Sequence, residues 1–174
     1  MSKRLACVAT ILAASLAVPA LAQNPRGAAS TNVAGKKLAV DYGRPALKGR
    51  ALDTLLKDLP PDRMWRAGEN QVTTINLEVD VMIGGKKVPA GKYSVYVHAG
   101  DANTWELVLT TDLGVPLGKI WAQAPDNMKN EPWPHMGDYT KTIAAQEVAR
   151  VPLTAAKAAA PADLFTISFA PAGD

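Results

Sequence analysis

The chain has 174 residues, of which 48% are hydrophobic, with a formal net charge of +3 and one cysteine, Cys7. This length suits one domain with an ordinary apolar core, without disulfide stapling. Because Cys7 lies in a segment that we expect to be removed, disulfides, cysteine nucleophiles and thiolate metal sites are excluded from the mature protein.

The first 22 residues have the order of a cleavable export signal. A basic start precedes an apolar run from Leu5 to Val18, and Pro19 and Ala20-Leu21-Ala22 follow. We predict a signal peptide over 1–22 and therefore a periplasmic or secreted protein. The alternative is a membrane anchor, but a spanning helix needs about 20 continuous apolar residues and this run is shorter. No membrane span is expected after cleavage.

Cleavage removes two basic residues, Lys3 and Arg4, and leaves 17 basic residues against 16 acidic ones. A nearly neutral chain without a long run of like charges gives no case for nucleic-acid binding. Any site for an anion therefore has to be local.

Residues 23–37 are mostly small and polar, which predicts a flexible leader. A single β-rich domain is expected over 38–170, followed by a C-terminal tail at 171–174. The domain opens with a short strand at 38–42. Leucines at helical spacing then predict one short helix at 51–59, which the following proline pair ends.

The centre of the domain has the clearest pattern. Apolar and polar side chains alternate over 74–83, which predicts a half-buried strand. Gly84-Gly85 predicts a tight hairpin turn, because glycine adopts positive φ angles without steric penalty. A second turn at Pro89-Ala90-Gly91 is followed by alternating strands at 93–98 and 105–109.

The C-terminal third is less regular. A weak strand is expected at 120–122, a proline-rich loop at 125–136, and strands at 146–153 and 164–169. The alanine-rich residues 154–162 favour a linker over a helical turn. Many short strands and antiparallel turns predict a mostly β fold, either an antiparallel β-sandwich or a jelly-roll-like barrel.

The local motifs of catalysis are absent from the sequence, including G-x-S-x-G, H-E-x-x-H and the glycine-rich nucleotide loops. Only two histidines exist, His98 and His135, so one chain cannot build a three-histidine zinc site. We predict no metal and no cofactor. Glu69 with either histidine is the pair that a hydrolase would use, although a solvent-facing histidine and a loop histidine are the simpler reading.

Two stretches rich in arginine, glycine and tryptophan form the candidate binding surface. Arginine binds carboxylates and phosphates through paired bonds, glycine permits close approach, and tryptophan offers a stacking surface. The predicted ligand-binding residues are Arg44, Lys48, Arg50, Trp65, Arg66, Glu69 and Asn70. The structural alternative is that these arginines pair with Asp41, Asp53 or Glu69 and so tie loops to the sheet, and that the tryptophan belongs to the core.

The same stretches carry a resemblance. They read Gly43-Arg44-Pro45-x-x-Lys48-Gly49-Arg50 and Trp65-Arg66-x-Gly68-x-Asn70-x-x-Thr73, and Ile83-Gly84-Gly85-Lys86-Lys87-x-Pro89-Ala90-Gly91-x-Tyr93 follows. Together they resemble the bacterial family catalogued as domain of unknown function 2911. The resemblance implies an exported protein with a β-rich domain, and it brings no reaction, ligand or catalytic residue.

Three functions remain open from the sequence. The first is a non-catalytic exported binding module for a small molecule, such as a small anionic ligand, for a glycan or for an envelope protein. The second is a hydrolase of envelope or extracellular material, and the third is a structural component of the envelope. The absence of catalytic motifs from the sequence favours a protein that is not an enzyme.

Overall fold

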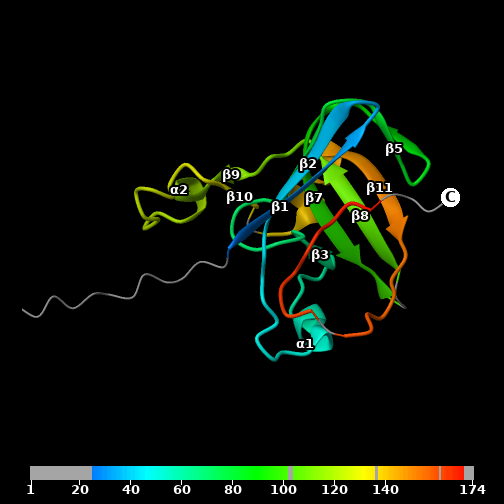
Figure 1. The fold of residues 1–174 in the computed structure, drawn as a ribbon. Helices are drawn as coiled ribbons and strands as arrows, with labels where there is room; N and C mark the ends of the chain where they lie inside the picture. The colour runs from blue at the N-terminus through cyan, green and yellow to red at the C-terminus, as the bar shows by residue number, and fades with distance from the viewer. Residues whose placement is uncertain (1–24, 102–103, 136, 161, 171–174) are drawn as a thin grey trace, which may run out of the picture.

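A computed structural model describes residues 25–101, 104–135, 137–160 and 162–170 (Figure 1). The predicted signal peptide and the predicted C-terminal tail lie outside these residues. Within the described residues, no helix is both long enough and apolar enough to cross a membrane.

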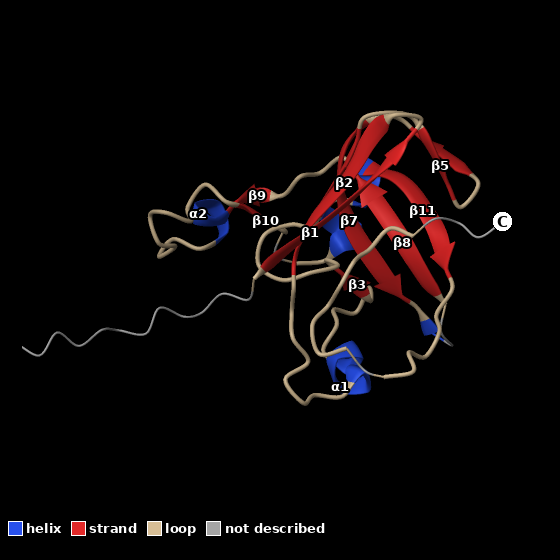
Figure 2. Cartoon of the chain, in the orientation of Figure 1, coloured by secondary structure: helices blue, strands red, loops and turns tan. Residues whose placement is uncertain are grey.

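Most strands belong to one antiparallel sheet of seven strands in the order β1-β2-β4-β7-β8-β11, with β3 paired to one end of β7 (Figure 2). These strands are β1 (Arg26–Val33), β2 (Lys36–Gly43), β3 (Met64–Trp65), β4 (Thr74–Leu77), β7 (Gly91–Ala99), β8 (Trp105–Thr110) and β11 (Glu147–Leu153). The prediction of a mostly β, antiparallel fold is confirmed. The described strands close no barrel, because β1 and β11 end the sheet on opposite sides.

Two small ribbons and four short helices complete the described fold. The ribbons are β5 (Val81–Ile83) with β6 (Lys86–Val88), and β9 (Val115–Pro116) with β10 (Pro132–Trp133). The helices are α1 (Leu52–Lys57), α2 (Leu117–Ile120), α3 (Tyr139–Thr142) and the 3-10 helix η2 (Ala144–Gln146). Helix α1 confirms the short helix predicted near 51–59.

The alternation predicted for β7 gives the sheet two faces of different chemistry. Tyr93, Val95 and Val97 enter one hydrophobic cluster, on what we call the apolar face. Tyr96 enters a second cluster on the opposite side, the mixed face, where His98 also points. The β5–β6 ribbon covers part of the apolar face, and α3 packs on the mixed face.

The prediction of a flexible leader over 23–37 is wrong for most of its length. Residues 26–33 form β1, which pairs with β2 over its whole length. Ala34 and Gly35 have φ angles of 50° and 75°, which make the tight turn of a hairpin. The side chains of β1 are mostly small and show no apolar alternation, so the sequence did not predict this strand. Its main-chain pairing with β2 specifies it instead.

The strand predicted over 74–83 is divided in two. The chain leaves the sheet after Leu77 and resumes as β5 at Val81, and the apolar alternation persists because β5 packs on the same cluster. The turn predicted at Gly84-Gly85 is confirmed, with φ angles of 54° and 80°.

The C-terminal third differs from the sequence-based expectation at two segments. The strand expected at 120–122 does not form, because α2 ends at Ile120 and a turn follows; the N–H of Trp121 donates to the carbonyl of Leu117 at 2.9 Å. Residues 164–169 form an extended segment with a single bridge, Leu164 to Ala46, instead of a strand. The strand expected at 146–153 is β11, and the described part of 154–162 is a linker without helix.

We expect Leu109→Ala to lower the free energy of unfolding by about 2–5 kcal/mol, because Leu109 is 1% exposed in the larger cluster and its truncation leaves a cavity. Urea denaturation measures this loss. Leu52→Ala is the matched control, since Leu52 is 54% exposed on α1. Equal destabilisation by the two changes would contradict this assignment of the core.

Candidate functional site

The C-terminal residues 163–169 lie across the apolar face as an extended segment, which we call the strap (red in Figure 1). Its main chain pairs with the segment that follows β2. Leu47 donates to the carbonyl of Asp163 at 2.8 Å, and Phe165 donates to the carbonyl of Pro45 at 2.9 Å. The strap is therefore an added layer over the sheet.

Two predicted site residues, Arg44 and Trp65, hold the strap in place. Arg44 donates from Nε to the carbonyl of Phe165 at 3.1 Å and from Nη2 to Thr166 Oγ1 at 3.0 Å. The ring of Trp65 meets that of Phe165 edge to face, with centroids 4.8 Å apart. Tyr42 adds a second edge contact to Phe165 and accepts a hydrogen bond from Ile167 N at 2.9 Å.

Lys48 and Arg50 lie between α1 and the residues that hold the strap in place. The main-chain N–H of Lys48 donates to Asp163 Oδ1 at 2.9 Å, so this residue also fastens the start of the strap. Arg50 donates to the carbonyls of Leu47 and Ala46 at 3.0 and 2.9 Å. The guanidinium groups of Arg44 and Arg50 thus donate to main-chain carbonyls and not to Asp41 or Asp53, which were two of the partners that the structural alternative named.

Arg66, Glu69 and Asn70 belong to the loop between β3 and β4. Burial lowers the pKa of Arg66, while the nearby charge of Glu69 acts in the opposite direction. Asn70 has a φ of 62°, a left-handed conformation that asparagine adopts more readily than most residues. The seven predicted residues therefore divide between the stretch that holds the strap and this loop, and none of them is among the residues that line the cavity described below.

The glycines of the two stretches allow one main chain to touch another. A Cβ atom on Gly43 would lie 1.9 Å from the carbonyl oxygen of Glu69, and one on Gly68 would lie 2.5 Å from Thr73 Oγ1. The loop is fixed in turn by Thr73, whose hydroxyl donates to the carbonyl of Ala67 at 2.9 Å. These glycines serve a contact between β2 and the loop.

A cavity of about 430 Å³ lies between the strap and the apolar face, and it opens to solvent. This volume is within the range of small-molecule pockets, roughly 300–1,000 Å³. Its lining is mainly aliphatic and aromatic, and includes Ile83, Val95, Val97, Leu107, Leu109, Phe165, Ile167 and Phe169. Sequence reasoning missed this site, because alternating apolar residues on neighbouring strands predict a closed core.

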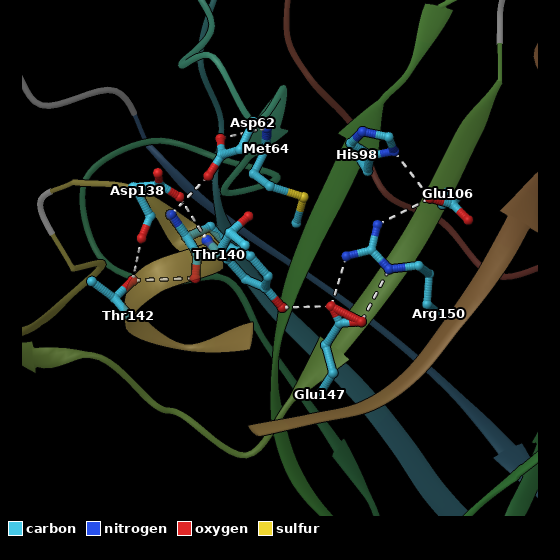
Figure 3. A network of polar contacts seen from close by, with 10 residues as sticks. Asp62, Met64, His98, Glu106, Asp138, Thr140, Thr142, Glu147 and Arg150 are labelled. Atoms are coloured by element: carbon cyan, nitrogen blue, oxygen red, sulfur yellow. Dashed lines mark hydrogen bonds and ion pairs between the residues drawn. The ribbon is translucent and has the colours of Figure 1, made fainter. Parts of the chain in front are cut away.

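The mixed face carries a network of charged side chains (Figure 3). Arg150 binds Glu147 through two bonds of 3.0 and 2.6 Å and Glu106 through a third of 3.0 Å. His98 Nδ1 lies 3.0 Å from the same oxygen of Glu106, and the hydroxyl of Tyr139 donates to Glu147 at 3.3 Å. The hydrogen bond from Arg150 is the main cause that lowers the pKa of Glu106, and Glu147 raises the pKa of Arg150.

Helix α3 is attached to this network at its N-terminal end, through its first residue, Tyr139. Asp138 caps the helix by accepting from Thr140 N at 2.9 Å, and Asp62 accepts from Tyr139 N at 2.7 Å (Figure 3). The ring of Tyr139 packs against that of Tyr96 with centroids 5.1 Å apart. The network therefore fastens α3 to the sheet.

The carboxylates that the structure sets beside the two histidines are Glu106 and Asp112. His98 meets Glu106, as described above, and His135 Nε2 lies 3.1 Å from Asp112 Oδ2. A hydrolase using Glu69 with either histidine stays a prediction. Among the described residues, no group of three histidine, cysteine or acidic side chains is arranged to hold a metal ion.

We expect Gly43→Ala to destabilise the fold strongly, because its methyl group would overlap the carbonyl oxygen of Glu69 and separate β2 from the loop. Thermal unfolding measures the effect. Gly118→Ala is the matched control, since a Cβ atom there meets only ordinary contacts at 3.4 Å. A similar melting temperature for both variants would show that the close approach is not required.

The Glu106 pair makes stability depend on pH. Because the folded state holds the pKa of Glu106 below its usual value of 4.5, its contribution is present above that pH and is lost as the pH falls through the folded pKa. We expect Glu106→Gln to be less stable than the wild type at neutral pH, with a smaller difference in acid. Urea denaturation across pH measures this, with the exposed Asp126→Asn as control; a constant difference at every pH would contradict it.

Comparison with known proteins adds one finding. Residues 24–174 match the family described as Protein of unknown function (DUF2911). No curated protein and no solved structure matches the chain. The matched range covers all the strands described above and includes β1 and the strap. The chain therefore belongs to the DUF2911 family, as the Gly43-Arg44-Pro45 and Trp65-Arg66 stretches indicated.

Proposed function

We propose that the protein is a non-catalytic binding module for a small, largely apolar ligand, held in a sandwich-like interior between the sheet and the strap. The observation that carries this proposal is the open apolar cavity of about 430 Å³. An apolar cavity that remains accessible gains free energy by covering hydrophobic surface with a ligand. The export signal predicted from the sequence would place this function in the periplasm or outside the cell.

The lining of the cavity favours a ligand with an apolar body and one polar end. The floor is made by apolar side chains of β7 and β8, whereas Thr166 and Ser168 of the strap are the polar residues of the lining. The guanidinium of Arg44 bonds to the hydroxyl of Thr166, so one positive charge lies close to this side. A fatty acid or another amphiphile of similar size has this chemistry.

The contacts of the arginines weigh against the small anion or glycan that their abundance suggested. Arg44 and Arg50 donate hydrogen bonds to main-chain carbonyl groups, which leaves fewer of their N–H groups for a ligand. The ring of Trp65 packs against Phe165, which reduces the surface it can offer to a sugar. No specific observation favours the hydrolase or the structural envelope component over a binding module.

A dansyl-labelled fatty acid tests the proposal. We expect a saturable rise in its fluorescence with the wild-type protein, and binding weakened by about tenfold or more in Leu107→Phe, because the larger side chain occupies the cavity. Leu52→Phe adds the same bulk at an exposed position of α1 and should bind like the wild type. Thermal unfolding of each variant shows whether the fold is kept.

Two outcomes would overturn the proposal. The first is the absence of saturable binding to the wild-type protein. The second is unchanged binding by a folded Leu107→Phe variant, which would place the probe elsewhere on the molecule.

A further inference from the structure

The free edge of β1 supports an inference that is independent of the ligand cavity. This strand is the first in the order of the sheet, and among the described residues it pairs only with β2, from Arg26 to Val33. Its other edge presents main-chain N–H and C=O groups that pair with no strand of the described residues. Such an edge is a template for another strand.

The opposite end of the sheet carries several features that discourage strand addition. Pro152 removes one main-chain donor from β11, and the register of β11 shifts between Glu147 and Ala149. The β5–β6 turn also lies against this strand, since a Cβ atom on Gly84 would be 2.7 Å from the Cβ of Val151. Natural edges are protected by these means.

Strand β1 has none of these features. Its register with β2 is continuous over eight pairs, and from Gly27 to Val33 it contains neither a charged residue nor proline. Ala28 and Ser30 are exposed, and both are small. A second strand could therefore approach without removing a charge or a bulky side chain.

We propose that β1 pairs antiparallel with β1 of a second copy of this chain, so that the two sheets become continuous. The two-fold axis stands perpendicular to the sheet near Ala29 and Ser30, which keeps corresponding faces on the same side, as antiparallel pairing requires. This geometry sets the two Arg26 side chains at opposite ends of the new pair. The only charge of β1 then meets no like charge.

A second copy fits this edge better than a strand of unrelated sequence, because the pairing is self-complementary. With Ala29 on the axis, Ala28 faces Ser30 of the other copy; with Ser30 on the axis, the two Ser30 residues face each other. Small side chains therefore meet at the centre of the pair in both registers. The family match begins at residue 24 and thus includes the whole strand.

Charge placed at these positions gives a test that separates pairing from folding. We expect sedimentation equilibrium to show a concentration-dependent dimer for the wild type. The double variant Ala28→Lys with Ser30→Lys should be monomeric, because like charges then face each other in either register. The double variant Ala28→Glu with Ser30→Glu should also be monomeric, and an equimolar mixture of the two should restore the dimer.

The control adds the same charge away from the edge. Ala155→Lys with Ala158→Lys lies in the exposed linker and should dimerise like the wild type. The proposal is overturned if the wild type stays monomeric at every concentration. Binding of a synthetic peptide of the β1 sequence by a monomeric wild type would overturn it equally. It is also overturned if the lysine variant dimerises as the wild type does, or if the folded variants stay monomeric when mixed.

Discussion

The contact between the end of β2 and two distant segments is the constraint on which the rest of the structure depends. Gly43 lets the loop after β3 touch the strand directly, and the next residue, Arg44, binds the strap. One short stretch therefore fixes both the loop at the edge of the cavity and the layer that covers it. Without this contact the apolar face would be open to water along β7 and β8.

The two faces of the sheet solve the same packing problem with different chemistry. The apolar face is covered by the strap, which leaves room between the layers. The mixed face is covered by α3, whose Tyr139 hydroxyl bonds to Glu147. Arg150 pairs in turn with both Glu147 and Glu106. Because paired charges lose much of their attraction when one partner moves, this side is specified by geometry more than by area.

The sequence predicts the strands of the sheet well where alternation and turn residues agree. The β5–β6 turn follows from Gly84-Gly85, and the opposite faces of Val95 and Tyr96 follow from a period of two. It could not predict β1, whose alanine, serine and threonine side chains carry no alternation and which is specified by main-chain pairing with β2. The β-propensity of the side chains does not predict a strand that main-chain hydrogen bonds specify.

The sequence pointed to the stretch that holds the strap, but it predicted neither the roles of these residues nor the cavity. Arginine, glycine and tryptophan in one stretch indicate that something is held there, but the sequence does not say whether it is a ligand or the chain itself. Arg44 meets Phe165 across 121 positions of sequence, and no local pattern reports a contact of that length. The cavity depends on the same long-range contact and is equally invisible in the sequence.

The long separation in sequence between the strap and the segment that it binds has a consequence for the order of folding. Synthesis runs from the N-terminus, so β7 and β8 exist long before their cover does, and closing a loop of 121 residues is slow compared with forming a hairpin. The apolar face of the sheet is therefore expected to stay exposed to solvent until the strap binds.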